Sequence, residues 1–222
     1  MALGRTLRAG ALVIAAAICA IAGCGLPDAR PVLPPPTHPG SSVTAKQFTF
    51  KVPESSAATF RGIELYYRMF PVESVPERDL ESREELAAAG FRRIASSTDD
   101  DPPSLPLIEG PGAGVVVTLD FSRTDIGADP VATFRHRDGA QREVDLRRAV
   151  RSGTDDYKRF ACDEFVPGDV DIATVTEELA DPENCEMVQL QLFALSYGDT
   201  DRFTVYSEAL NLGSIDLTFG RQ

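Results

Sequence analysis

The chain has 222 residues and a formal net charge of −12, with 43% hydrophobic and 25% charged residues. This composition is that of an ordinary globular domain, so it excludes a wholly disordered, a collagen-like and a multi-spanning membrane protein. The acidic balance argues against nucleic acid as a partner, because neutralising phosphates needs a surplus of Lys and Arg.

The N-terminus carries the three-part pattern of an export signal. Arg5 and Arg8 precede an uncharged apolar run over residues 11–22, and the small residue Gly23 follows. The run is shorter than the roughly 20 residues that cross a bilayer as a helix. We therefore expect residues 1–23 to be a signal peptide that is removed on export.

The quartet Ile21-Ala22-Gly23-Cys24 resembles the bacterial lipobox. The resemblance implies that Cys24 becomes the first residue of the mature chain and carries a diacylglycerol, commonly with an N-acyl chain. Two or more acyl chains anchor a protein stably. The resemblance therefore predicts an exported lipoprotein that is held on the membrane through Cys24. The outer membrane or cell surface is favoured over the periplasmic face of the inner membrane. An ordinary secretory signal with an incidental cysteine is the alternative.

Two cysteines remain for the mature domain, because Cys19 leaves with the signal and Cys24 takes the lipid. In an oxidising compartment Cys162 and Cys185 are predicted to form a disulfide, worth about 3 kcal/mol. A metal site is the alternative, but two cysteines without a nearby histidine fall short of four ligands.

Residues 24–44 are predicted to hold the lipid attachment and a tether. This segment contains six prolines, followed by Gly40, Ser41 and Ser42, and shows no apolar period. Such a composition favours an extended or flexible spacer. The folded domain is therefore expected over residues 45–222.

Period-two alternation of apolar residues, or in residues 115–121 a run of β-branched residues, predicts β-strands in several short runs. These runs are residues 47–52, 63–69, 115–121, 188–197 and 215–219. The first two are expected to be half-buried, whereas the run over 188–197 is apolar on both faces near its end, as in a central strand. One stretch differs, because residues 77–89 combine five acidic residues with Leu80, Leu86 and a following glycine, which predicts a short surface helix. Together these elements predict a mainly β, antiparallel sandwich.

Residues 62–68 end in Tyr-Tyr-Arg, and residues 192–198 with 205–213 contain a small-residue bend and a Tyr-Ser-Glu stretch. The first segment resembles the central strand of a fibronectin type III domain, and the second pair resembles its last hairpin. Combined with the lipobox and the proline-rich lead, they are similar to spirochaete envelope lipoproteins. The resemblance implies an immunoglobulin/fibronectin type III-like β-sandwich. About 120 residues separate the two matches, whereas the whole fold usually has about 100, so a large insertion is expected and the strands over 91–187 stay open.

The motifs of common catalytic sites are absent from the sequence. It has two histidines, His38 and His136, and contains neither a nucleophile elbow nor a phosphate-binding loop. We therefore expect no catalytic residue, no cofactor and no metal. A calcium site is the alternative. Its ligands would be Asp169, Asp171 and the carboxylates near residues 177–181, although their spacing matches no EF-hand.

Charge is unevenly distributed along the chain. Six arginines against three carboxylates lie over residues 135–151, whereas residues 163–201 hold 11 carboxylates and no Lys or Arg. The arginines predict an anion-binding patch, because guanidinium groups suit carboxylate and phosphate; its candidate residues are Arg135, Arg137, Arg142, Arg147 and Arg148. The alternative is a solvated hairpin, turning at residues 137–140, whose arginines pair with the acidic stretch.

These patterns predict a non-enzymatic binding or adhesion module of the cell envelope. Its expected partners are the membrane, through lipidated Cys24, and a protein or polysaccharide ligand. A structural or assembly component of the envelope and a hydrolase on a sandwich scaffold are the alternatives.

Overall fold

The computed structural model describes residues 33–39, 46–54, 59–71, 74–76, 79–96, 108–109, 115–135, 139–150, 157–166, 168–173 and 188–219. The chain divides into two compact units, Met1–Pro31 and Val32–Gln222, and all described residues belong to the second. Its elements are β1 (Gln47–Lys51), β2 (Phe60–Pro71), α2 (Arg83–Ala88), β3 (Arg92–Arg93), β4 (Ala95–Ser96), β5 (Ile108–Glu109), β6 (Val116–Asp120), η1 (Ser122–Ile126), β7 (Val131–Arg135), β8 (Gln141–Ala149), β9 (Tyr157–Lys158), η2 (Cys162–Glu164), β10 (Val188–Asp199), β11 (Thr204–Tyr206) and β12 (Leu210–Leu217).

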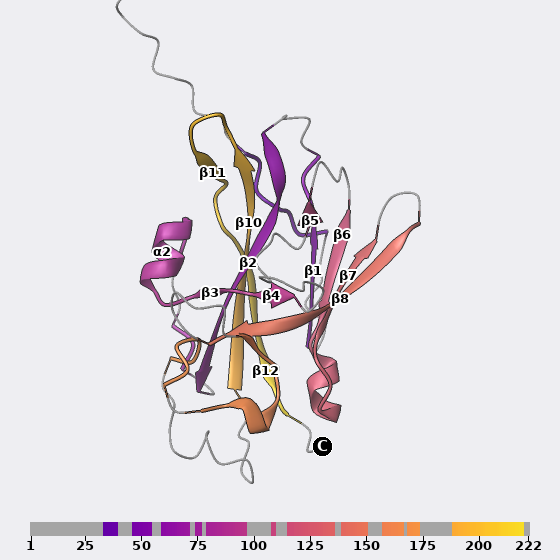
Figure 1. The fold of residues 1–222 in the computed structure, drawn as a ribbon, viewed down its shortest axis with the longest axis vertical. Coiled ribbons are helices and arrows are strands. Elements are labelled where there is room, and N and C mark those ends of the chain that lie inside the picture. Colours follow the sequence, from indigo (N-terminus) through magenta and orange to yellow (C-terminus); the bar gives the residue numbers. More distant parts are fainter. Residues whose placement is uncertain are drawn as a thin grey trace, which may run out of the picture. The chain divides into compact units, whose positions relative to one another are not determined.

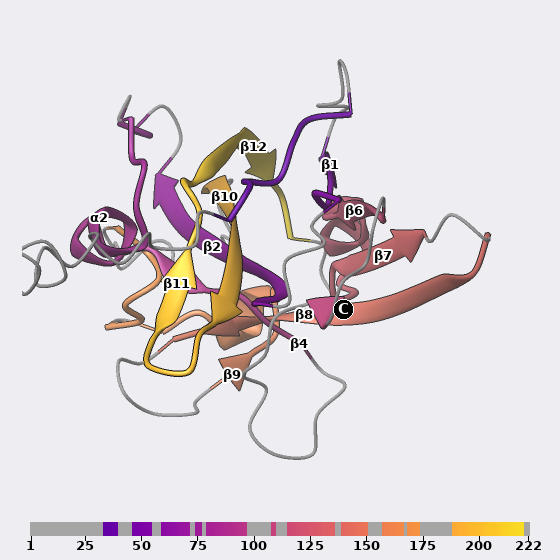
Figure 2. The same cartoon turned by 90° about the horizontal axis from the view of Figure 1, so that it is seen from above.

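These strands form two antiparallel sheets (Figures 1 and 2). The first sheet has the order β1-β6-β7-β8-β4, with β9 also paired to β8. The second has the order β11-β10-β2-β3, with β12 also on β10 and β5 also on β2. The prediction of a mainly β, antiparallel architecture is therefore confirmed.

The main core combines apolar side chains from both sheets. Phe48, Phe50 and Val52 are 1%, 0% and 0% exposed, as the alternation in β1 predicts. In β12 and the residues after it, Ile215, Leu217 and Phe219 are buried while the residues between them are exposed. Burying one face of each strand in this way is the main favourable contribution to folding.

β2 is buried on both faces, so the prediction of a half-buried strand is wrong for it. Its odd-numbered residues from Ile63 to Met69 belong to the main core. On its other face, Tyr66 and Phe70 join a second apolar cluster with Leu86 of α2, Phe91, Phe193 and Leu195. α2 and the segment that follows it cover this face of the second sheet. The alternation of apolar residues in β2 marks only the face toward the main core, so it could not predict that α2 covers the other face.

The helix is shorter than the range 77–89 predicted, and its ends have clear physical causes. The Ser82 hydroxyl accepts from the Glu85 N–H, while the Glu85 carboxylate accepts from the Ser82 and Glu81 N–H groups. This capping box begins the helix at Arg83. At the other end, the N–H groups of Gly90 and Phe91 bond to carbonyls of the last turn, and Gly90 has φ +83°. The helix therefore ends at the glycine C-cap that the sequence predicted.

Residues 33–39 pack on the domain, so the prediction that they form part of a tether is wrong. Leu33 is 1% exposed within the main core. Thr37 exchanges two backbone hydrogen bonds with Lys51, of 3.0 and 2.7 Å, and the Ser196 hydroxyl donates to the Pro34 carbonyl at 2.6 Å. The folded domain thus includes residues before 45. The rest of the predicted tether lies outside the described residues.

The segment over 91–187, whose strands the sequence left open, supplies most of the first sheet. The chain crosses between sheets within four residues, because β3 pairs with β2 and β4 pairs with β8. The predicted hairpin is confirmed, since β7 pairs with β8 from Arg135↔Gln141 to Val131↔Asp145. Val144 and Leu146 of β8 point into the core as expected.

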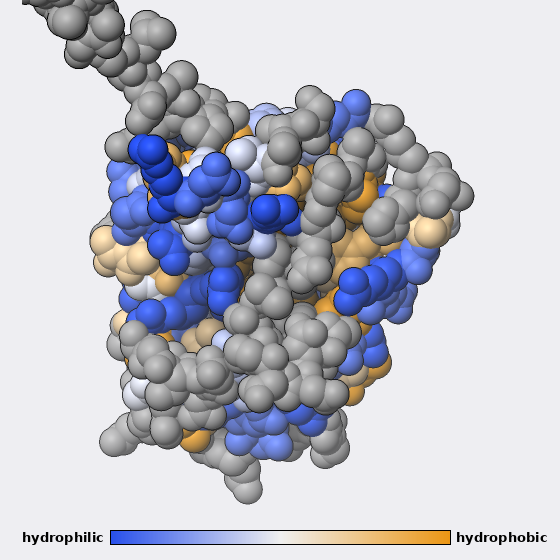
Figure 3. All heavy atoms as spheres, turned by 45° about the horizontal axis from the view of Figure 1, so that its top comes forward, coloured by the Kyte–Doolittle hydropathy of each residue, from blue (hydrophilic) through white to orange (hydrophobic). Residues whose placement is uncertain are grey.

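The surface in Figure 3 carries hydrophilic residues with smaller apolar areas between them. Among the described residues, no helix is both long and apolar enough to span a bilayer.

Candidate functional site

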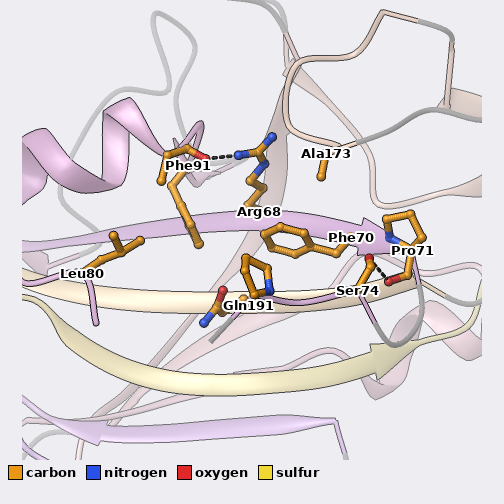
Figure 4. Close-up of a pocket in the computed structure, with 10 residues that line it drawn as sticks. Arg68, Phe70, Pro71, Ser74, Leu80, Phe91, Ala173 and Gln191 are labelled. Atoms are coloured by element: carbon orange, nitrogen blue, oxygen red, sulfur yellow. Dashed lines mark hydrogen bonds between the residues drawn. The ribbon is translucent and has the colours of Figure 1, made fainter. Parts of the chain in front are cut away.

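A cavity of about 280 Å³ lies on the outer face of the second sheet, where β2 and β10 run beside the end of α2 (Figure 4). Its lining comes from five separate stretches of chain. The lining residues are Arg68, Phe70, Pro71, Ser74, Pro76, Leu80, Ala89, Phe91, Ala173 and Gln191. This volume is close to the lower end of the range for small-molecule sites.

The walls of the cavity are mostly apolar and aromatic. Phe70 and Phe91 lie with ring centroids 6.3 Å apart, and Phe91 meets Phe193 edge-on at 5.1 Å. The C-terminal end of α2 at Gly90 places Phe91 against the sheet, because the Phe91 N–H donates to the Leu86 carbonyl of the last helical turn. The aromatic wall is therefore held by the ends of regular elements.

Two polar side chains, Arg68 and Gln191, sit next to each other in this apolar lining. They are register partners on the antiparallel strands β2 and β10, so their side chains share one face. One terminal nitrogen of Arg68 donates to the Ala89 carbonyl at the end of α2, and the guanidinium lies 5.5 Å from the Phe70 ring centroid. A Cβ on Gly90 would approach that guanidinium to 2.6 Å, so the glycine makes room for Arg68.

Gln191 is the unusual member of the lining. The residue is only 6% exposed, yet within the described part of the chain no residue hydrogen-bonds to its side-chain amide. The amide atoms of Gln191 are not among the buried side-chain atoms that lack a partner, so they are accessible from the cavity. The Ser74 hydroxyl, by contrast, is satisfied by the Pro71 carbonyl. An amide that opens on the cavity can donate hydrogen bonds to a ligand there and accept them from it.

A second polar cluster lies on the same face of the sheet and is fully engaged. The buried Glu64 carboxylate accepts from the Tyr66 hydroxyl at 2.8 Å and from Arg93 at 2.9 Å. Arg83, the first residue of α2, donates to the Tyr66 oxygen at 2.9 Å. Burial, with the nearby charge of Glu64 as the next cause, raises the pKa of Tyr66, so this hydroxyl stays a donor. The cluster therefore attaches the start of α2 to the sheet.

The structure separates the arginines of the predicted anion-binding patch. Arg135 and Arg142 are exposed on β7 and β8, and Arg137 lies outside the described residues. Arg147 forms an ion pair with Asp129. Arg148 is 0% exposed, so the prediction that it faces a solvent anion is wrong.

Arg148 binds carboxylates of its own chain. Its guanidinium lies 2.8 Å from Asp169 and 3.0 Å from Asp171, and 3.9 Å from the Phe165 ring centroid. Burial by itself lowers the pKa of Arg148, but the charge of Asp171 and its hydrogen bond outweigh this, and the net direction is upward. The alternative in which the arginines pair with the acidic stretch therefore applies to this residue.

Tyr67 joins this buried network from the other sheet. Its hydroxyl donates to Asp171 at 2.8 Å and accepts the Ala149 N–H at 2.7 Å. Burial, followed by the charge of Asp171, raises the pKa of Tyr67, so the hydroxyl remains protonated and links β2 to β8. Lys158 completes the cluster at 3.1 Å from Asp169.

The remaining predicted site residues are not placed by the structure. Cys24 and Cys185 lie outside the described residues, and Cys162 opens η2 without a described side chain, so the lipid attachment and the disulfide stay predictions. Residues 177–181 of the calcium alternative are likewise outside. Among the residues that are described, no three His, Cys, Asp or Glu side chains converge as a metal site.

Sequence reasoning missed the cavity. The available signal was the pair Gln189 and Gln191, two polar residues at alternate positions of a strand otherwise buried on both faces. A polar residue in such a run needs a partner or a cavity. The residues of the cavity walls come from segments that are distant in sequence, so no local sequence pattern predicts that they meet.

Comparison of this chain with protein-family models, with curated proteins and with solved structures finds no match in any of the three.

Proposed function

We propose that this chain is an exported, lipid-anchored binding module of a bacterial cell envelope, without catalytic activity, and that its ligand binds in the cavity beside α2. One observation carries the binding role: an apolar, aromatic-walled cavity has the Gln191 amide in its lining, and that amide opens on the cavity.

The proposed fold class is the immunoglobulin/fibronectin type III-like sandwich of the spirochaete lipoproteins that the chain resembles. In that fold the central strand and the last hairpin share one sheet. Here β2 pairs with β10, and β10 pairs with β12, which are the segments that carry the resemblance. Their adjacency supports the class.

The anchor is supported by the quartet that ends at Cys24. Metabolic labelling with a clickable fatty acid tests it, using Cys24→Ala and, as matched control, Cys19→Ala in the signal. We expect label on the wild type and the control and none on Cys24→Ala. Labelled chain in Cys24→Ala would refute the anchor. Protease treatment of intact cells then decides between display at the surface and a periplasmic location.

The binding role is tested by a fragment screen with ligand-observed NMR. Ala173→Phe fills the cavity from its wall, and Ala140→Phe, at the exposed β7–β8 turn, adds the same ring elsewhere. We expect fragments that bind the wild type and the Ala140 variant to lose binding to the Ala173 variant. Hits that bind all three proteins equally, or a complete absence of hits, would refute the cavity as the binding site.

A further inference from the structure

We infer that the domain rests on the lipid bilayer with the end of the second sheet that carries the β10–β11 turn, and that the Phe203 side chain in this turn contacts the headgroup region of the membrane. This inference rests on the lipid anchor proposed at Cys24. It adds a second, non-covalent contact with the same membrane and assigns the end of the domain that faces it.

The chain between the lipid and the folded domain is shorter than the sequence predicted. Leu33 is buried in the main core, and it lies nine residues after Cys24. A chain of this length spans at most about 32 Å when it is fully extended. The anchor therefore holds Leu33, and the part of the domain around it, close to the membrane.

Leu33 joins the domain beside the β10–β11 turn. A Cβ on Gly198 would lie 3.2 Å from the Leu33 side chain, and the Ser196 hydroxyl donates to the Pro34 carbonyl. Gly198 is the last residue but one of β10, and the turn at residues 200–203 follows. The lipid-bearing segment thus meets the domain at the end of the sheet that carries this turn.

The 3-10 helix η1 lies at the opposite end of β10 (Figure 1). It hydrogen-bonds to the residue that follows β12, and the last residue of β12 pairs with Val188, the first residue of β10. From Val188 to Gly198 the strand spans about 33 Å, at about 3.3 Å per residue. Placing η1 on the membrane would therefore extend the nine-residue connection to its limit, which costs conformational entropy. Placing the turn there needs no such extension.

Phe203 is the large apolar residue that this end exposes. It is 46% exposed, and the Thr200 hydroxyl, which accepts from the Arg202 and Phe203 N–H groups at 3.3 and 3.0 Å, fixes the turn that carries it. Moving an aromatic ring out of water is favourable, and aromatic residues are common at membrane interfaces. The turn holds one acid, Asp201, and one base, Arg202, so the contact does not need anionic lipid.

The covalent anchor makes a contact of this size sufficient. One exposed ring would not hold a free domain on a bilayer, since even a single acyl chain binds only marginally. A short connection to the lipid, however, keeps the turn at a high effective concentration beside the membrane. A weak contact then orients a domain that the lipid already retains.

This orientation leaves the cavity beside α2 in water. Gln191 precedes Gly198 by seven residues on β10, which places it about 23 Å further from the membrane along the strand. A ligand of the cavity would therefore arrive from the aqueous phase and not from the bilayer.

Tryptophan fluorescence tests the contact, because the chain contains no tryptophan. Phe203→Trp places a single indole in the turn, and Ile126→Trp, at a residue of η1 that is 76% exposed, is the matched control at the far end. The lipidated chain is purified from cells and reconstituted into phosphatidylcholine vesicles, with and without lipids brominated on the upper part of the acyl chain, which quench indoles on contact. We expect Phe203→Trp to lose most of its emission to the brominated lipid, and Ile126→Trp to lose almost none.

The outcomes separate this inference from the proposed anchor. If the chain floats with the vesicles and Phe203→Trp is not quenched, the contact is wrong and the anchor stands. If both indoles are quenched equally, the assigned end is wrong. If the chain does not float with the vesicles, the anchor and this inference both fall. Both replaced residues are exposed, so both variants should fold, which circular dichroism verifies; if Phe203→Trp unfolds, Arg202→Trp at the adjacent exposed residue takes its place and should be quenched in the same way.

Discussion

Replacing Arg148 by Met should destabilise the domain severely without changing its surface. The guanidinium makes hydrogen bonds of 3.0 and 3.1 Å to Asp171 and of 2.8 Å to Asp169. The side chains of Arg148 and Asp171 are both 0% exposed, so water cannot replace the lost partner. Asp169 keeps Lys158 at 3.1 Å. The cost therefore falls on Asp171, which is left with the Tyr67 hydroxyl and no cation.

The size of the effect follows from this burial. Breaking a buried pair by removing one partner costs about 3–5 kcal/mol, whereas an exposed pair contributes about 0–1 kcal/mol. The lost contact with the Phe165 ring, at 3.9 Å, adds up to about 2 kcal/mol. Methionine keeps much of the apolar volume, so we expect a loss of about 3–5 kcal/mol in the free energy of unfolding. That is a large share of the 5–15 kcal/mol of a typical domain.

Urea unfolding followed by circular dichroism measures this loss. Arg142→Met, the same substitution at an exposed arginine of the same strand, should stay within about 0.5 kcal/mol of the wild type. The double variant Arg148→Met/Asp171→Asn removes the unbalanced charge and keeps an acceptor for Tyr67, so it should be more stable than Arg148→Met alone. A loss below about 1 kcal/mol for Arg148→Met, or no recovery in the double variant, would refute the reasoning.

Three further variants test backbone and capping features. Gly198→Ala should cost about 1–3 kcal/mol of unfolding free energy, because a Cβ there would lie 2.1 Å from the Thr59 carbonyl oxygen; an unchanged thermal midpoint would contradict this. Gly90→Ala should cost about 1 kcal/mol through its positive φ, and its Cβ should displace the Arg68 guanidinium; crystals showing Arg68 unmoved would count against it. The two backbone amides that donate to Glu85 lower its pKa from the ordinary 4.5, so its contribution to stability is present above that pH and disappears as the pH falls through the lowered value. Glu85→Gln should accordingly be less stable than the wild type at neutral pH and equal to it in acid, and a gap independent of pH in urea melts would rule this out.

The sequence by itself determined the local elements, because their causes lie among near neighbours. Alternating apolar residues predicted β1 and β12, since successive side chains of a strand point to opposite faces, and a β-branched run predicted β6. Gly90 marked the end of the helix, because its left-handed conformation suits residues without a Cβ. The hairpin of β7 and β8 was equally readable from its turn and its inward Val144 and Leu146.

Only the tertiary structure decided which residues meet across the chain. Arg148 looked like an exposed anion-binding residue until Asp171, 23 positions away, was placed beside it. β2 looked half-buried until α2 was placed over its second face, and Gln191 became significant once the cavity formed around it. The physical reason is that the alternation in a strand shows only which side chains face the core and which face solvent. Which strands pair, and which elements cover a sheet, depends on the packing of side chains that are distant in sequence.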